Sequence, residues 1–476
     1  MTAPWTLNPD RCFAPDPSVR ARARDLYAGV RDLPLVCPHG HVDPRLLADP
    51  DARFGDPAEL LIVPDHYVFR MLYSQGVPME DLGIPSRDGT PVETDPRAIW
   101  RTFCAHYHLF RGTPTGTWLK AELVDLFGLD EKPSASSADR LFDRIQARLD
   151  APEFRPRALF RRFGIEALTT TDAATDDLSP HARIRADGFP VAPTFRPDGV
   201  LHLAAEGWRE AIDLLERRSG VAVDSAAALF EALRERRAAF RALGATATDH
   251  GTFTPFIEPL GDAEAEALFA RARSDGRGGA ALRDADDARF HGHALMQMAA
   301  MAREDGMTMQ LHVGSFRNHH ERVFRRFGLD KGADIPVAVD WTRGLRTLLN
   351  THGHDAAFRL VLFTLDEATY GRELAPLAGH YPALRLGAPW WFFDSVLGFD
   401  RYLDRVVETA GIYHLAGFND DTRAFASIPA RHDVWRRTVA NWLAGMVERG
   451  LVDADDAPEM AHWLAYGAAK ATYGIA

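Results

Sequence analysis

Two histidines stand two residues apart at the end of an apolar run, in the stretch "LVCPHGHVDP" (residues 35–44). Imidazoles bind metal ions and exchange protons near neutral pH. On an extended strand, residues i and i+2 point to the same side, so His39 and His41 would face one metal ion or one polar ligand. The alternative is a polar strand end without chemistry.

The same His-x-His pattern occurs three more times, so its surroundings must separate chemistry from coincidence. On a helix, residues i and i+2 diverge and cannot easily share a ligand. The surroundings of the other pairs are typical of helices or of a helix end with a glycine turn. We therefore assign a structural or surface role to His106, His108, His291, His293, His352 and His354.

The composition is that of a globular protein with a substantial core. Of 476 residues, 46% are hydrophobic and 26% are charged, which suits two or three domains or one barrel with large insertions. The formal net charge of −12 argues against general nucleic-acid binding, because phosphate contacts need basic patches. An anionic ligand would have to be attracted locally by specific arginines.

The chain lacks the usual signals for membrane insertion and export. No apolar run approaches the roughly 20 residues of a membrane span, and the N-terminal stretch has no basic flank with an apolar segment behind it. Cys12, Cys37 and Cys104 form no C-x-x-C motif, which argues against a disulfide framework and a thiolate zinc site. We therefore expect a cytoplasmic protein that binds neither membranes nor nucleic acids.

Short apolar or β-branched runs alternate with segments of helical periodicity. Strands separated by helices predict parallel β/α units, and eight such units predict an α/β fold, a distorted (β/α)8 TIM-type barrel. The expected strands span residues 33–39, 165–172, 190–198, 244–251, 307–314, 358–367, 383–391 and 411–421.

Two intervals, 42–164 and 199–243, are too long for a single crossover between strands. The first is mostly helical and rich in aromatic residues, so we interpret it as a subdomain inserted after the first strand. The predicted organisation is an N-terminal helical segment (1–32), a barrel (33–41 and 165–476) and the helical insertion (42–164).

In barrels of this kind the chemistry lies at the carboxyl ends of the strands. Those ends concentrate the residue types that bind metals, move protons and hold anions. The residues there are His39, His41, Asp172, Arg196, Asp198, Asp249, His250, His312, Asp366, Glu367, Trp390, Trp391, Asp420, Asp421 and Arg423.

These residues fall within a longer series of motifs that runs through nearly the whole chain. The motifs are "PHGHVDP", "PDHYVFRML", "TTTDAATDDL", "PTFRPD", "TDHG", "MQLHVGSFRN", "LGAPWWFFDS" and "GFNDDTRAFASIPARHDVWRR". In content and order the series resembles the uronate (glucuronate) isomerases of the amidohydrolase superfamily. The resemblance implies aldose–ketose isomerisation of small hexuronates, glucuronate to fructuronate and galacturonate to tagaturonate, by a homo-oligomer.

The chain also departs from the two-metal members of that superfamily. The fourth strand, "ATATDHG", has no bridging lysine, and the sixth, "FTLDE", has no metal-binding histidine. The resemblance implies at most one divalent ion, held by His39, His41 and Asp421, with His312 as a further candidate. Zinc suits such a ligand set. Because isomerisation needs no activated water, the ion need not be essential.

Isomerisation needs a base near C2 and donors for the developing oxyanion. The resemblance gives Asp421 as a base, unless it is a metal ligand only. Tyr67 is the alternative base, unless it is a packing aromatic of the insertion. His66 would polarise the carbonyl oxygen or cap a helix, and Arg423 would stabilise the enediolate or pair with Asp420 or Asp421.

The substrate must also be held in place. Arg196 is the candidate anchor for the carboxylate through two parallel hydrogen bonds, unless it pairs structurally with Asp198. Asp249 and His250 would hold sugar hydroxyls, and His312 would bind the metal or donate to a hydroxyl.

Trp390 and Trp391 would form a wall of the pocket. Since adjacent residues on a strand face opposite ways, we expect only one of the two rings to line it.

Two other functions remain open at this point. A one-metal hydrolase or decarboxylase of the same superfamily would fit the histidines, although the missing strand-six histidine argues against it. A sugar-acid binding protein without catalysis would have no need of Asp421, Tyr67 and His66.

Overall fold

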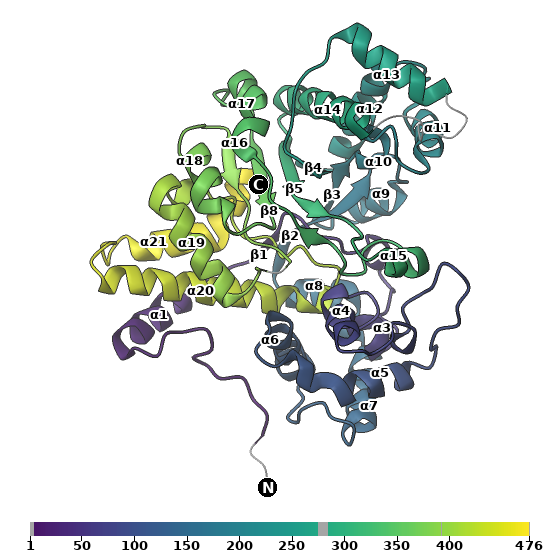
Figure 1. The fold of residues 1–476 in the computed structure, drawn as a ribbon. Helices are drawn as coiled ribbons and strands as arrows, with labels where there is room; N and C mark the ends of the chain where they lie inside the picture. Colours follow the sequence, from purple (N-terminus) through teal and green to yellow (C-terminus); the bar gives the residue numbers. More distant parts are fainter. Residues whose placement is uncertain (1–3, 275–283, 392, 476) are drawn as a thin grey trace.

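The structure is a computed structural model, and it describes residues 4–274, 284–391 and 393–475. Its centre is a curled parallel sheet in the order β1-β2-β3-β4-β5-β8-β9 (Figure 1). The fold is a distorted TIM-type barrel, as predicted. The strands are β1 (Leu35–Cys37), β2 (Ile165–Ala173), β3 (Val191–Arg196), β4 (Ala247–Thr252), β5 (Thr308–Val313), β8 (Leu360–Thr364) and β9 (Leu384–Leu386).

Two neighbouring strands of the sheet, β5 and β8, are buried along their whole length, as expected where helices cover one face and the barrel interior the other. A short antiparallel pair, β6 (Ser315–Phe316) and β7 (Ile335–Pro336), follows β5 and stands outside the main sheet. The loop that contains this pair therefore lies beyond the carboxyl end of β5.

The predicted eighth strand at 411–421 is wrong. Residues Ile412–His414 form a 3-10 helix, and a single bridge joins Leu386 to Leu415. Two further hydrogen bonds close the barrel: the Ala416 amide donates to the Leu386 carbonyl (2.9 Å), and the His41 amide donates to that of Thr422 (3.0 Å).

The backbone explains why no eighth strand forms. Gly417 (φ +83°) and Asp421 (φ +39°) both adopt left-handed conformations that interrupt an extended chain. The segment 415–422 thus fills the eighth position of the barrel with an irregular loop.

Helices surround the sheet and connect successive strands. Those between β2 and β9 are α9 (Ser179–Ala186), α10 (Asp198–Leu201), α11 (Trp208–Ser219), α12 (Ala226–Ala242), α13 (Asp262–Ser274), α14 (Asp284–Asp305), α15 (Glu321–Phe327), α16 (Trp341–Gly344), α17 (Arg346–His352) and α18 (Ala375–Ala378). After β9 come α19 (Val396–Ala410), α20 (Ile428–Glu448), α21 (Ala457–His462) and α22 (Ala468–Tyr473), and α1 (Pro17–Val30) packs against α20.

A second group of helices lies between β1 and β2 and gathers on one side of the barrel (Figure 1). Trp100, Phe103 and Leu123 belong to its buried core, which continues into β1 and β2. The three-part division of the chain stays a prediction. The helices are α2 (Arg45–Ala48), α3 (Pro57–Leu61), α4 (His66–Ser74), α5 (Pro96–His106), α6 (Pro114–Ala121), α7 (Ala138–Leu149) and α8 (Pro156–Arg162).

Helix α4 carries the two residues of this group that were predicted to act on a substrate. Asp65 caps its N-terminus, because the Asp65 carboxylate accepts a hydrogen bond from the Tyr67 amide (2.8 Å). The helix therefore starts at His66, and the cap is Asp65 and not His66. Within the described residues, no helix has both the length and the apolar character required to cross a membrane.

The irregular eighth segment generates a stability prediction. Gly417→Ala should lower the free energy of unfolding by about 2–4 kcal/mol, since a side chain disfavours the left-handed backbone and overpacks the site. The added methyl would stand 2.4 Å from the Ala469 amide nitrogen. Urea midpoints followed by circular dichroism measure the effect.

The matched control is Gly445→Ala in α20, where nothing lies within 4 Å of the added methyl. This variant should keep or slightly raise the midpoint, because alanine stabilises a helix relative to glycine. Equal midpoints for the two variants would contradict a constrained backbone at Gly417.

Candidate active site

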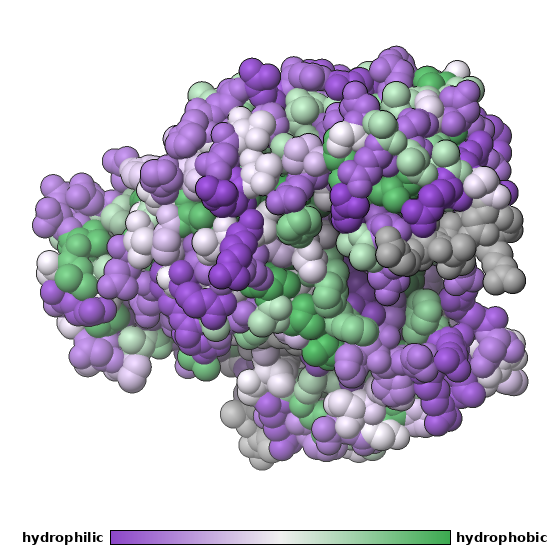
Figure 2. Space-filling model, turned by 45° about the horizontal axis from the view of Figure 1, so that its top comes forward, coloured by the Kyte–Doolittle hydropathy of each residue, from purple (hydrophilic) through white to green (hydrophobic). Residues whose placement is uncertain are grey.

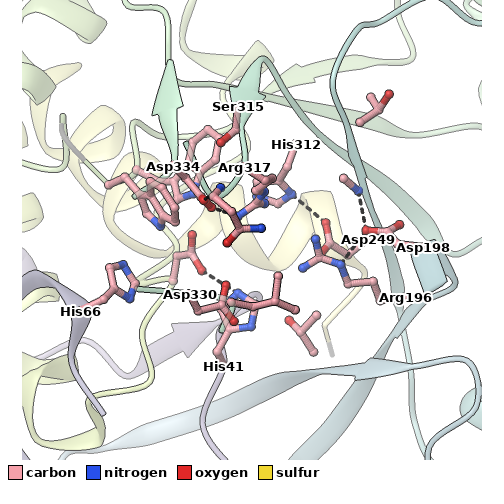
Figure 3. A pocket seen from close by; sticks show the side chains of 18 of the residues that line it. His41, His66, Arg196, Asp198, Asp249, His312, Ser315, Arg317, Asp330 and Asp334 are labelled. Carbon is pink, nitrogen blue, oxygen red and sulfur yellow. Dashed lines mark hydrogen bonds and ion pairs between the residues drawn. The ribbon is translucent and has the colours of Figure 1, made fainter. Parts of the chain in front are cut away.

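A cavity of about 680 Å³ opens at the carboxyl ends of the strands. Figure 2 shows the molecule hollowed on this face, with hydrophilic residues inside the hollow, and Figure 3 shows the side chains that converge on it. The predicted residues that line it are His39, His41, His66, Arg196, Asp198, Asp249, His312, Trp390, Trp391, Asp421 and Arg423. Tyr67 and His250 are not among the lining residues.

Three ligand-type side chains meet at the floor of this cavity. His39, His312 and Asp421 are buried, and one ligand atom from each lies within 4.8 Å of the others. His41 stands just outside this group, with its Nε2 3.2 Å from Asp421 Oδ1. His312 thus joins His39 and Asp421 in the candidate metal set, and His41 stays a predicted ligand beside Asp421.

The surroundings of His312 suit a metal ligand. Its Nδ1 is 2.7 Å from Asp249 Oδ1, and its ring stacks on Phe363 at 4.3 Å. Its Nε2 is buried without a hydrogen-bond partner in the described part of the chain. A histidine oriented through one nitrogen by a carboxylate, with the other nitrogen free, has the usual arrangement at metal sites. The donor set therefore fits one divalent cation.

Asp421 is ionised and held in place by imidazoles. Its Oδ1 lies 3.5 Å from His39 Nε2 and 3.2 Å from His41 Nε2. Burial acts to raise the pKa of Asp421, but the hydrogen bonds from the two histidines outweigh it and hold the pKa well below its ordinary value. The left-handed backbone at Asp421 is uncommon for a residue with a side chain, and strained conformations of this kind concentrate at functional sites.

His66 and Tyr67 reach the site from the inserted helices, but only His66 lines the cavity. Their rings stack at 4.6 Å, and the Tyr67 ring packs edge-on against Trp118. Burial lowers the pKa of His66 to about 3, and it raises the pKa of Tyr67 well above its ordinary range. His66 is therefore a neutral imidazole, and Tyr67 is a buried phenol.

Each of the three arginines of the lining pairs with an aspartate. Arg196 donates to Asp198 (2.8 Å) and lies 3.2 Å from Asp249. The salt bridge to Asp198 thus exists, and Arg196 does not present a free pair of parallel donors.

The other two arginines pair with residues of the loop that follows β5. Arg423 pairs with Asp330 at 2.8 Å, and not with Asp420 or Asp421. Arg317 pairs with Asp334 at 2.6 Å.

Several residues of the lining were not predicted from the sequence. Arg317, Asp330 and Asp334 come from the loop after β5, where no periodic pattern indicates which side chains turn inward. His202 follows α10, and its ring stacks on that of His291 at 4.0 Å. The motif "SFRN" was the one available signal for Arg317.

Other strand-end residues point away from the cavity. His250 follows Asp249 on β4 and therefore faces the opposite side, where its Nε2 lies 3.1 Å from Thr248 Oγ1. Asp172 accepts a hydrogen bond from Thr170, and burial raises its pKa to about 7.

The remaining strand-end carboxylates have structural partners. Glu367 pairs with Arg401 at 2.6 Å, and the carboxylate of Asp420 is 3.4 Å from His432 Nε2. Asp366 caps a turn by accepting from the Ala368 amide. The helical histidine pairs at 106/108, 291/293 and 352/354 are also absent from the lining.

Trp390 and Trp391 both line the cavity, which corrects the expectation of only one. The strand ends at Leu386, and Trp391 has a left-handed backbone (φ +60°). The alternation of a strand therefore no longer applies to the two rings. Trp390 packs edge-on against His312 at 5.0 Å.

Comparisons with known proteins agree with this geometry. A family model described as glucuronate isomerase matches residues 18–473. The chain belongs to the glucuronate isomerase family. A uronate isomerase of Nostoc punctiforme is 55% identical over 476 residues and is covered completely, as is this chain.

Solved structures give the same result. The crystal structure of glucuronate isomerase from Caulobacter crescentus has a TM-score of 0.96 and 46% identity, covering 99% of this chain and 98% of that one. A uronate isomerase structure from Thermotoga maritima has a TM-score of 0.90 and 27% identity, covering 98% and 99%. The expectation of an isomerase is confirmed over those of a hydrolase, a decarboxylase or a binding protein.

Two histidines of the cavity should titrate on opposite sides of the ordinary value of 6.5. The pKa of His66 is lowered to about 3. Burial acts to lower the pKa of His202, but Asp287, 3.2 Å from its Nδ1, raises it above 6.5. As the pH falls from about 8 to about 4, NMR of the imidazole nitrogens should show His202 gaining a proton while His66 stays neutral.

The sign of the effect on stability follows by linkage. Below a pH of about 6.5, His66 is protonated in the unfolded chain but stays neutral in the native protein. The free energy of unfolding therefore decreases as the pH falls from about 6.5 towards about 3. The His202 term is present below about 6.5 and is lost as pH rises through its raised pKa. Asp287→Asn should lower the pKa of His202 and leave that of His66 unchanged; simultaneous titration of both rings near 6.5 would refute the assignment.

Proposed function

We propose that this chain interconverts D-glucuronate with D-fructuronate, and D-galacturonate with D-tagaturonate, by moving a proton from C2 to C1 through an enediol. The observation that carries the proposal is that the ionised carboxylate of Asp421 shares one cavity with three arginines. A proton acceptor, cationic donors and a site for an anionic substrate are what this reaction requires.

Asp421 takes the proton from C2 of the open-chain sugar. Its contacts with His39 and His41 run through Oδ1, which leaves Oδ2 for the proton. As the C2–H bond breaks, its electron pair forms the C1=C2 double bond, and the C1 oxygen becomes an enediolate. The C2 hydroxyl passes its proton to the C1 oxygen, which becomes the C1 hydroxyl. Asp421 returns its proton to C1, which takes it up with the electron pair of the C1=C2 bond, while the C2 oxygen becomes the ketone.

Asp421 is a better base than Tyr67 in this structure. The Tyr67 hydroxyl is buried beside the guanidinium of Arg431, and Tyr67 is not part of the lining. Ionising a buried phenol whose pKa is already raised costs free energy that an ionised carboxylate does not require.

His66 and Arg423 stabilise the oxygen that becomes negative. A neutral imidazole donates one N–H hydrogen bond without adding a charge, and the low pKa of His66 keeps it in that form. The guanidinium of Arg423, held by Asp330, supplies a fixed positive charge on the other side.

Arg196 anchors the C6 carboxylate through the donors that Asp198 and Asp249 leave free. Its two aspartates fix the plane of the guanidinium before substrate arrives, so little side-chain entropy is lost on binding. Asp249 contributes twice, because it also orients His312.

A single divalent cation would be held by His39, His312 and Asp421, and zinc suits two imidazoles and one carboxylate. When bound, such an ion supplies two positive charges and a Lewis acid to a lining in which five aspartates outnumber three arginines. We further propose a cytoplasmic homo-oligomer. The free state of Cys12, Cys37 and Cys104 supports a reducing compartment.

Removing the proposed base tests the proton transfer. In Asp421→Asn, turnover should fall on the order of 10³-fold or more while uronate binding changes little, because general-base catalysis acts on the barrier. Proton NMR with both uronates in deuterated water follows turnover and exchange at C1. Metal content is quantified in each sample.

Tyr67→Phe is the matched variant, and it should keep most of the turnover. A primary isotope effect with C2-deuterated uronate in the wild type would establish that proton abstraction is visible in turnover. Near-normal turnover in Asp421→Asn, with loss in Tyr67→Phe, would transfer the role of base to the phenol. No turnover of either uronate by the wild type would refute the proposed function itself.

Replacing the anchor tests the charge of the substrate. Arg196→Met should cost about 2–4 kcal/mol in transition-state binding of uronates, as expected for a charge-assisted pair. A neutral aldohexose has no carboxylate at C6 and should lose far less. Displacement of Asp249 and His312 would lower kcat/KM for both substrates. Equal losses in kcat/KM would therefore give Arg196 a structural role and make Arg317 the better candidate anchor.

A further inference from the structure

A buried arginine outside the cavity contacts both parts of the chain that supply the proposed base and its neighbours. Arg431 lies in the first turn of α20 and is 2% exposed. Its Nε donates to Ser427 Oγ (3.1 Å), and its NH1 donates to Asp394 Oδ2 (2.8 Å) and to the Asp420 carbonyl oxygen (3.4 Å). The guanidinium thus binds the loop on both sides of Asp421.

The same guanidinium packs against two aromatic rings of the inserted helices. Its central carbon lies 3.7 Å from the ring centroid of Trp118 on α6 and 4.7 Å from that of Tyr67 on α4. The Tyr67 ring stacks in turn on His66, which lines the cavity. Arg431 therefore contacts both the aromatic residues of the inserted helices and the barrel loop that carries Asp421.

The loop around Asp421 needs such support. A residue with a side chain at φ +39° tends to relax towards a more common conformation, and only fixed neighbours prevent it. On one side, Asp420 is held through its carbonyl by Arg431 and through its carboxylate by His432. On the other side, the carbonyl of Thr422 accepts from the His41 amide.

Ser427 connects Arg431 to the far side of the loop. Its hydroxyl accepts from Arg431 Nε, donates to the Ala424 carbonyl, and lies 3.4 Å from Thr422 Oγ1. Arg431 therefore acts on the residues before and after Asp421, and its hydrogen bonds go to Ser427, Asp394 and Asp420 and not to Asp421 itself.

We propose that Arg431 is a positioning residue, which holds the Asp421 carboxylate and the His66–Tyr67 ring pair in register across the cavity. The planar fork of arginine can donate to several acceptors within one plane while its flat faces remain available to pack on rings. Lysine has the charge but neither the fork nor the faces. A displacement of the base by about 1 Å is enough to cost on the order of 10²-fold in rate.

The test is Arg431→Lys, measured beside a matched control, Arg237→Lys. Arg237 on α12 is equally buried, pairs with Asp305 (2.8 Å) and packs over Phe195. Its hydrogen bonds, ion pair and ring contact within the described part of the chain include no residue that lines the cavity and none of the 420–427 loop. Both variants lose a buried guanidinium and should lose comparable stability. Only Arg431→Lys should lose kcat, on the order of 10²-fold, with KM for uronate changed less than about threefold.

The isotope effect with C2-deuterated uronate adds a readout that a purely structural role would not move. It should increase in Arg431→Lys, because a displaced base makes proton abstraction more rate-limiting. Normal kcat and isotope effect in folded Arg431→Lys, or an equal loss of kcat in Arg237→Lys, would overturn the proposal.

If Arg431→Lys does not fold, Ser427→Ala decides the question. It removes one acceptor of Arg431 and should lower kcat about tenfold at unchanged KM, and an unchanged kcat would overturn the proposal. The inference rests on the proposed reaction. Uronate turnover by the wild type is measured in the same assay. If the wild type turns over uronate and the variants do not behave as expected, the positioning role of Arg431 is wrong; if the wild type shows no turnover, the proposed reaction is wrong.

Discussion

The structure depends above all on keeping one buried carboxylate ionised. Removing Asp421 from water acts against its charge, and the imidazoles of His39 and His41 offset that effect. The carboxylate must also face the cavity from a loop whose backbone is left-handed. Most of the features around the site, from the His-x-His spacing of β1 to the start of α20, serve to meet these two demands.

The lining extends the same principle to the substrate. An isolated arginine in a cavity of this size would be flexible and hydrated, whereas each arginine here is fixed by an aspartate. Arg196 has two such partners, and Arg317 and Arg423 have one each. The aspartates fix the orientation of the guanidinium groups, but they also cancel much of the positive charge of the cavity. Recognition of an anion therefore relies on the placement of the hydrogen-bond donors and not on the overall field of an acidic protein.

The sequence predicted the barrel because hydrophobic periodicity survives in seven of its strands, and the predicted strand ends brought ten predicted residues to one cavity. The sequence could not predict the irregular eighth segment, because strand propensity gives no information about the positive φ angles of Gly417 and Asp421. Partners far apart in the chain, such as Arg423 and Asp330, also leave no local pattern.

Rotation about a local axis also decides which side chains reach the cavity, and sequence spacing does not give it. Tyr67 follows His66 directly, but on a helix adjacent side chains diverge by about 100°, and the phenol turns into the core. Whether His41, His312 or both complete the candidate metal set with His39 and Asp421 depends on how the imidazole rings are turned, which sequence spacing does not determine.

The irregular eighth position gives the barrel a seam. His39 and His41 lie on one side of this seam, after β1, and Asp421 lies on the other side. The hydrogen bond from the His41 amide to the Thr422 carbonyl crosses it. Opening the barrel at this seam would separate these groups. A ligand that contacts both sides of the seam therefore stabilises the closed barrel. Occupancy of the site and closure of the barrel are thus thermodynamically linked, because a ligand that binds only the closed barrel stabilises it.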